Sequence, residues 1–153
     1  MALLSGLVYV NETDIYDKYG AFLSEEKQGD RANLEAILQP SSLKENVAIN
    51  FREVAGEKYA DELSQVNEPR DVTLRFCIKA TTKALWMSQY KSFIEFLKSG
   101  DKGWLVFNFP SLDLELTMYY KSCSKFSPLT PLWKEGVHAA HFKVVFREPT
   151  PIF

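Results

Sequence analysis

The stretch from Asp71 to Ala80 places the strongest constraint on the fold, because apolar and mostly polar side chains alternate along it. The residues at even positions are apolar: Val72, Leu74, Phe76 and Ile78. Those between them are mostly polar: Thr73, Arg75, Cys77 and Lys79. Neighbouring side chains of a β-strand point to opposite faces of a sheet. The alternation therefore predicts a strand with one face in the core and the other toward solvent.

A helix is expected directly after this strand. Thr81 or Thr82 can cap its first turn, because a threonine hydroxyl accepts a hydrogen bond from an otherwise unpaired amide. Apolar residues then recur at steps of three and four and form one stripe: Trp86, Tyr90, Phe93, Ile94 and Leu97. Gly100 is expected to end the helix, since glycine tolerates the left-handed conformation that often follows a last turn.

Other strand-like patterns lie on both sides of this pair. They cover residues 7–10, 19–23, 47–51, 104–109, 114–121 and 137–147. Residues 31–38 fit either a helical turn or a strand, and residues 24–30 and 126–136 are expected to be loops. With 153 residues, the chain suits a single domain, 1–153. We expect a mainly β (α+β) fold: a β-sandwich or open β-barrel flanked by a single α-helix.

The composition narrows the range of functions. Apolar residues make up 46% of the chain and charged residues 25%, which is ordinary for a globular domain, and the net charge is −2. This balance disfavours a protein that holds nucleic acid on a basic surface. The sequence shows neither a secretory signal nor an apolar run of the roughly 18 residues that a membrane helix needs. Cys77 and Cys123 are expected to be free thiols in a protein made in a reducing cytoplasm.

Motifs for catalysis, cofactor binding or metal binding yield no candidate residues. The chain lacks a glycine-rich phosphate loop and a GxSxG nucleophile turn. His138 and His141 are three residues apart on an expected strand, so they point to opposite faces and cannot readily share a metal ion. Trp86, Trp104 and Trp133 fit core packing better than a ligand slot. We therefore expect no enzymatic activity, no metal and no cofactor.

A charged stretch from about residue 51 to residue 70 is unusual for a compact domain. Loops longer than about 15 residues are uncommon unless they have a function. One interpretation is an extended arm that docks on a neighbouring subunit, with Arg70 among its basic side chains, and the other is a solvated surface loop. Under the first interpretation the candidate oligomer-interface residues are Phe51, Arg52, Glu53, Glu57, Lys58 and Tyr59.

Several short motifs follow one another along the chain. The first group is Val8-Tyr-Val-Asn11, then Asp14-Ile15, then Tyr19-Gly20. The later ones are Phe51-Arg-Glu-Val-Ala-Gly56 before the charged arm, the helix Leu85–Lys98 followed by Gly103-Trp-Leu-Val-Phe107, and the closing Val145-Phe-Arg-Glu-Pro149. In this order they resemble the distal tail proteins of tailed phages, and the likeness extends over nearly the whole chain.

The resemblance implies the fold shared by tail-tube and distal-tail ring domains, and a structural role in the tail of a phage or prophage virion. Six copies would form a ring at the junction of tail tube and baseplate. The partners would be other copies of the chain and the tube, hub or fibre proteins, while DNA only passes through the channel. Three alternatives stay open: a tail-tube subunit of a contractile injection system, a small-molecule-binding β-barrel, and a hydrolase on a β scaffold.

Overall fold

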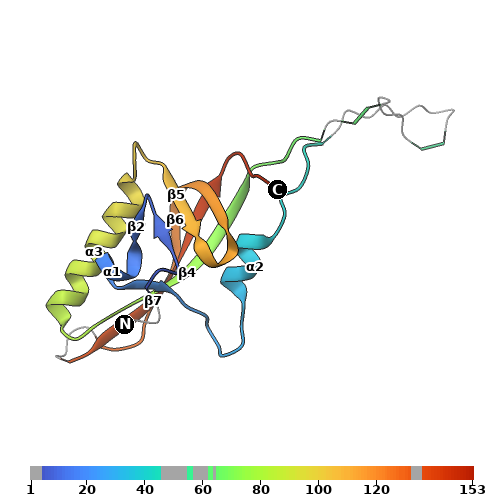
Figure 1. The fold of residues 1–153 in the computed structure, drawn as a ribbon. Helices are drawn as coiled ribbons and strands as arrows, with labels where there is room; N and C mark the ends of the chain where they lie inside the picture. Colours follow the sequence, from blue (N-terminus) through green and yellow to red (C-terminus); the bar gives the residue numbers. More distant parts are fainter. Residues whose placement is uncertain (1–4, 46–54, 57–61, 64, 132–135) are drawn as a thin grey trace.

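A computed structural model describes residues 5–45, 55–56, 62–63, 65–131 and 136–153 (Figure 1). In these residues one seven-stranded antiparallel sheet curls into a half-barrel, in the strand order β2-β1-β5-β6-β7-β4-β3. The strands are β1 (Tyr9–Val10), β2 (Thr13–Asp14), β3 (Ala21–Leu23), β4 (Arg70–Ala80), β5 (Leu105–Phe109), β6 (Leu114–Pro128) and β7 (His138–Glu148). The helices are α1 (Ile15–Tyr19), α2 (Ala32–Leu38), α3 (Lys83–Ser99) and the 3-10 turn η1 (Pro110–Leu112). The expected mainly β fold with a flanking helix is confirmed.

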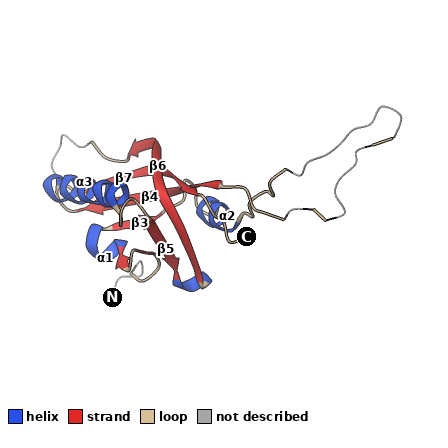
Figure 2. Cartoon of the chain, turned by 90° about the horizontal axis from the view of Figure 1, so that it is seen from above, coloured by secondary structure: helices blue, strands red, loops and turns tan. Residues whose placement is uncertain are grey.

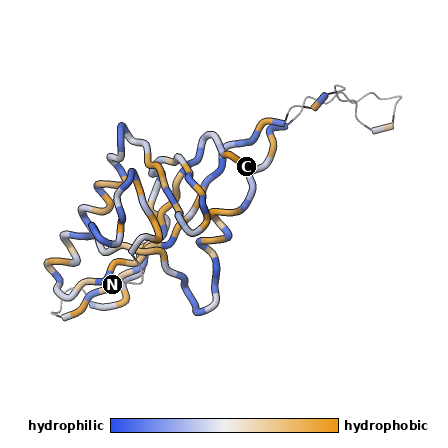
Figure 3. Tube along the Cα trace, in the orientation of Figure 1, coloured by the Kyte–Doolittle hydropathy of each residue, from blue (hydrophilic) through white to orange (hydrophobic). Residues whose placement is uncertain are grey.

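The long strands β4 and β7 are neighbours in the sheet, and β4 lies next to the edge strand β3. They pair in register from Arg70 opposite Glu148 to Ala80 opposite His138. The apolar face predicted for β4 is confirmed, because Val72, Leu74, Phe76 and Ile78 are fully buried. Figure 3 shows the matching alternation of apolar and polar residues along the strands. Phenylalanines from several elements fill the space inside the curl: Phe76, Phe93, Phe107, Phe142 and Phe146.

Helix α3 covers the inner face of the sheet (Figure 2). Thr82 caps it, since its hydroxyl accepts a hydrogen bond from the Leu85 amide at 3.1 Å. The predicted stripe faces the core, and the Trp86 indole also donates to the Ile78 carbonyl at 2.9 Å. Gly100 ends the helix with a φ of +49°, and a Cβ there would lie 2.4 Å from the Trp104 carbonyl oxygen. Glycine is thus required by both conformation and space.

The N-terminal region contains a short helix that the strand-like pattern did not predict. Asp14 caps α1 by accepting a hydrogen bond from the Tyr16 amide at 3.0 Å. Gly20 ends the helix in the left-handed conformation, with a φ of +68°. Because Tyr19 belongs to α1, only residues 21–23 of the expected 19–23 strand pair with β4. The Asp and Gly that mark this part of the motif are therefore the two caps of one helical turn.

Two further expectations need correction or completion. Residues 126–128 were expected to be part of a loop, but β6 continues to Pro128. A proline is tolerated there because an edge strand leaves some amides without a ladder partner.

Residues 32–38 form α2, so the helical interpretation of residues 31–38 is the correct one. The expected strand at 47–51 lies outside the described residues. No helix in the described ranges has the length and apolarity needed to cross a membrane.

Candidate assembly surfaces

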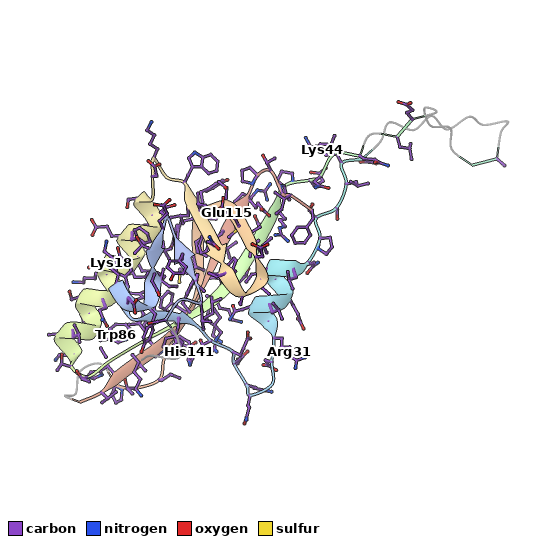
Figure 4. The ribbon with its side chains drawn as sticks, in the orientation of Figure 1. Lys18, Arg31, Lys44, Trp86, Glu115 and His141 are labelled. Atoms are coloured by element: carbon purple, nitrogen blue, oxygen red, sulfur yellow. The ribbon has the colours of Figure 1, made fainter. Side chains whose placement is uncertain are left out.

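The chain leaves the compact fold through a short antiparallel stem, residues 41–44 and 66–68 (Figure 1). The Lys44 amide donates to the Val66 carbonyl at 2.7 Å, and the Glu68 amide donates to the Ser42 carbonyl at 2.6 Å. Figure 4 labels Lys44 at this point. Leu43 is 52% exposed and Val66 is 50% exposed, so the stem presents apolar side chains to its surroundings.

Arg70, the first residue of β4, attaches this region to the sheet. Its Nε donates to Glu148 Oε1 at 2.5 Å, in a pair whose side chains are only 10% and 2% exposed. Its other nitrogens donate to the Gln39 carbonyl and, at 3.1 Å, to the Ile37 carbonyl. These carbonyls lie at the end of α2, where no intrahelical amide is left to pair with them. One guanidinium therefore joins α2, β4 and β7.

The C-terminal residues lie against the same stem. Both the amide and the hydroxyl of Ser41 donate to the Phe153 carbonyl, and the Asn67 amide group donates to the Pro151 carbonyl at 3.2 Å. The Arg70 guanidinium also lies 5.1 Å from the centre of the Phe153 ring. The stem is thus held to the sheet from two sides.

The six interface residues expected from the sequence all lie outside the described residues: Phe51, Arg52, Glu53, Glu57, Lys58 and Tyr59. The structure therefore places none of them. Arg70 was grouped with the charges of the arm, and this is wrong, because Arg70 is buried in its ion pair with Glu148. The sequence carried no signal for that pair, whose members are 78 positions apart.

The second half of β6 forms a long open edge. β5 pairs only with Leu114–Met118, while β7 pairs with β6 from Tyr119 to Pro128. Within the described ranges no strand pairs with the other side of residues 119–128. Unpaired amides and carbonyls on such an edge are a template for another chain. We call residues 119–128 the open edge of β6.

Several features of the open edge restrict what can pair with it. The register shifts at Tyr120/Ser122 and again at Cys123/Lys125. Lysines and irregular pairing are features with which proteins limit indiscriminate strand addition. A partner strand must therefore match this edge in both shape and charge.

An apolar hollow lies at one end of the sheet, between α2, β3 and η1. It has a volume of about 260 Å³, and its wall includes Leu7, Phe22, Leu34, Ile37 and Leu112. Pockets for small ligands usually measure about 300–1,000 Å³. The inside of the curl, where a lipocalin-like protein would bind its ligand, is occupied by the buried phenylalanines.

A serine–histidine pair lies on the outer face of the sheet. The Ser24 hydroxyl is 2.7 Å from His141 Nδ1, and burial together with the positive charge of Arg75 lowers the pKa of His141. The adjoining hollow has a volume of only about 10 Å³, roughly one water position. His138 is buried on the opposite face of β7, as the strand period predicts.

The two cysteines occupy different environments. Cys77 is buried beneath the outer face of β4, whereas Cys123 is exposed on the open edge of β6, and both are free thiols. Burial raises the pKa of the Cys77 thiol, and partial desolvation by neighbouring groups raises the pKa of Cys123 although its side chain is exposed. Of the three tryptophans, Trp86 is in the core and Trp104 is 44% exposed, while Trp133 lies outside the described residues.

A comparison with protein-family models finds no match for this chain, and a comparison with curated proteins finds no relative.

Proposed function

We propose that the chain is a non-catalytic structural subunit of a phage or prophage tail, located in the virion, which forms a ring of six copies at the junction of tail tube and baseplate. The observation that carries this proposal is the open edge of β6 in a sheet that stops at a half-barrel. Cyclic assembly removes exposed sheet edges by pairing them between copies.

Two surfaces support a role in assembly. The open edge of β6 provides main-chain groups for strand pairing between subunits, which requires little side-chain specificity. The stem provides a fixed base, held by Arg70 and the C-terminal residues, from which the charged arm extends to a neighbour. Permanent interfaces of this kind bury about 2,000 Å² or more.

The remaining partners follow from the same role. The subunit contacts tube, hub or fibre proteins above and below its ring, and it needs no cofactor. DNA passes through the channel without being held, which suits a chain of net charge −2. A tail-tube subunit of a contractile injection system is the nearest alternative, and it differs in stacking its rings into long tubes.

The first test is the mass of the purified chain in solution, measured by size-exclusion chromatography with light scattering over a series of concentrations. We expect a discrete species near six times the 17.5 kDa mass of one chain. A ladder of stacked rings would favour the tube subunit. A monomer at every concentration, also in the presence of tail extracts, would contradict the proposal.

Deletion of residues 55–65 tests the arm in the same assay. We expect the deletion variant to lose the large species while its circular dichroism spectrum and urea midpoint stay unchanged, because residues 55–65 lie beyond the stem pairing. Full assembly of the deletion variant would show that the arm is a surface loop. A bulky maleimide attached to Cys123 is expected to block assembly as well, with the Cys123→Ser variant as the control.

A further inference from the structure

The outer face of the sheet, on the side away from α3, carries a row of three basic side chains. Arg75 of β4 lies directly opposite Lys143 of β7, and Lys143 lies directly opposite Lys125 of β6. We call these three residues the cationic row. Like charges that face each other across neighbouring strands destabilise a sheet. The row is therefore costly for the folded chain unless an anion neutralises it.

Four residues before Arg75 on β4, the same three strands carry a second group of charges in which the cations are paired with a carboxylate. Asp71 of β4 accepts hydrogen bonds from Lys121 at 2.9 Å and from Arg147 at 3.0 Å. These two hydrogen bonds lower the pKa of Asp71, and the bond from Lys121 has the larger effect, so the carboxylate stays charged. In the cationic row, β4 contributes Arg75 opposite Lys143, whereas in the second group it contributes Asp71 opposite Arg147. The row therefore has a cation where the second group has a carboxylate.

Nothing in the described part of the chain neutralises the cationic row. Glu26 lines the same small hollow, but neither it nor any other described carboxylate forms an ion pair with the three cations. Arg75 Nη1 is buried and has no hydrogen-bond partner among the described residues. A buried unpaired donor costs free energy. Lys125 is exposed and Lys143 is partly exposed, so these two cations are accessible to a partner that brings acceptors.

We propose that the cationic row binds the acidic segment 45–62 of a second copy of this chain. This segment has five acidic and two basic side chains, hence a net charge of −3, and its described acidic members Glu45 and Glu62 are exposed. An extended chain spans about 3.3 Å per residue, so an out-and-back excursion of this length reaches up to about 30 Å beyond the stem. The inference rests on the proposed self-assembly and names the surface that receives the arm.

Duplex DNA is the less suitable partner for this face. DNA-binding surfaces neutralise many phosphates at once with Lys and Arg. Here the basic row is three residues wide, and Glu26 lines the same small hollow. A short acidic peptide matches the size of the row, whereas the phosphates of a duplex extend far beyond three cations and would meet the Glu26 carboxylate.

Binding can be measured without relying on assembly. The probe is a fluorescent peptide of residues 45–62, and the receptor is the full chain carrying Glu53→Lys and Glu57→Lys, whose own arm cannot compete. We expect anisotropy to show binding that weakens about tenfold when Lys125→Glu and Lys143→Glu are added to the receptor. Lys91→Glu, at an exposed position of α3, makes the same change of charge elsewhere and should leave binding unaltered.

Two results would overturn the inference whether or not the chain forms rings. One is a receptor that does not bind the peptide or binds it equally well after the row is reversed. The other is a receptor that binds a labelled duplex through the row in preference to the peptide. The light-scattering measurement of the unmodified chain tests the proposed function separately, so the two failures are distinguishable.

Mixing experiments test whether the contact joins two copies. The row-reversed chain (Lys125→Glu, Lys143→Glu) and the arm-reversed chain (Glu53→Lys, Glu57→Lys) should each fail to assemble alone. An equimolar mixture should recover the large species, because every row then meets an arm of opposite charge on the neighbouring copy. Assembly of either variant alone, or no recovery on mixing, would contradict binding between copies.

Discussion

The buried ion pair of Arg70 and Glu148 allows a quantitative prediction. Arg70→Met keeps the length of the aliphatic stem but removes the only cation that pairs with Glu148 in the described part of the chain. Because Glu148 is 2% exposed, the carboxylate cannot recover its lost partner from water. Leaving a buried charge unpaired costs about 3–5 kcal/mol. For a domain of this size, that corresponds to a fall in Tm of roughly 6 to 20 °C.

Two further variants separate the ion pair from the general effect of substitution. Lys121→Met removes a 49% exposed partner of Asp71, and since Asp71 keeps Arg147, the loss should stay below about 1 kcal/mol. Arg70→Met combined with Glu148→Met should recover most of the lost stability, because the buried charge is gone. A remainder of about 1 kcal/mol is expected for the α2 carbonyls that lose their donor.

Urea denaturation followed by tryptophan fluorescence measures all three variants. An Arg70→Met variant that is destabilised no more than Lys121→Met would refute the cost assigned to the unpaired Glu148 charge. A double variant as unstable as Arg70→Met would refute it as well, because the loss would then come from packing and not from an unpaired charge.

Three other outcomes can be checked on the same protein. Burial and a nearby arginine lower the pKa of His141 below 6.5, so the unfolded chain binds this proton more readily than the folded chain does. The free energy of unfolding should therefore fall as the pH drops from 6.5 through the folded-state pKa. In His141→Gln the urea midpoint should change less steeply with pH. A thiol reagent should label Cys123 rapidly and Cys77 only after unfolding, and equal rates would contradict the described burial. Trp86→Ala should cost about 3–5 kcal/mol in the urea titration, whereas Trp104→Ala, at an exposed site, should cost far less.

Local patterns were sufficient for the elements whose signals are local. The alternation in residues 71–80 predicted both β4 and its buried face, and the stripe from Trp86 to Leu97 with Thr82 and Gly100 predicted α3. The signals for α1 were also present, as Asp14 and Gly20, but a five-residue helix offers too few turns for a periodic pattern to stand out. The end of β6 was missed because proline usually breaks strands, and only its place on an open edge makes it acceptable.

The candidate surfaces were less predictable than the fold. The sequence pointed to a charged arm near residues 51–70, and the structure adds the stem at its base and the ion pair that anchors it. The open edge of β6 could not be predicted, because it depends on a difference in strand length. β5 has 5 residues and its neighbour β6 has 15, so most of β6 extends beyond β5. The prediction for the six residues of the arm remains a prediction.

By itself, the sequence determined the alternating faces of the long strands, the helix that covers them and the absence of familiar catalytic motifs, since each of these is encoded by residues close together in the chain. Only the tertiary structure decided which charges meet. Arg70 forms a buried ion pair with Glu148, and Asp71 forms ion pairs with Lys121 and Arg147. Arg75 lies in a row with Lys143 and Lys125. The physical reason is that strand register brings together residues that are dozens of positions apart, and no local pattern records that register.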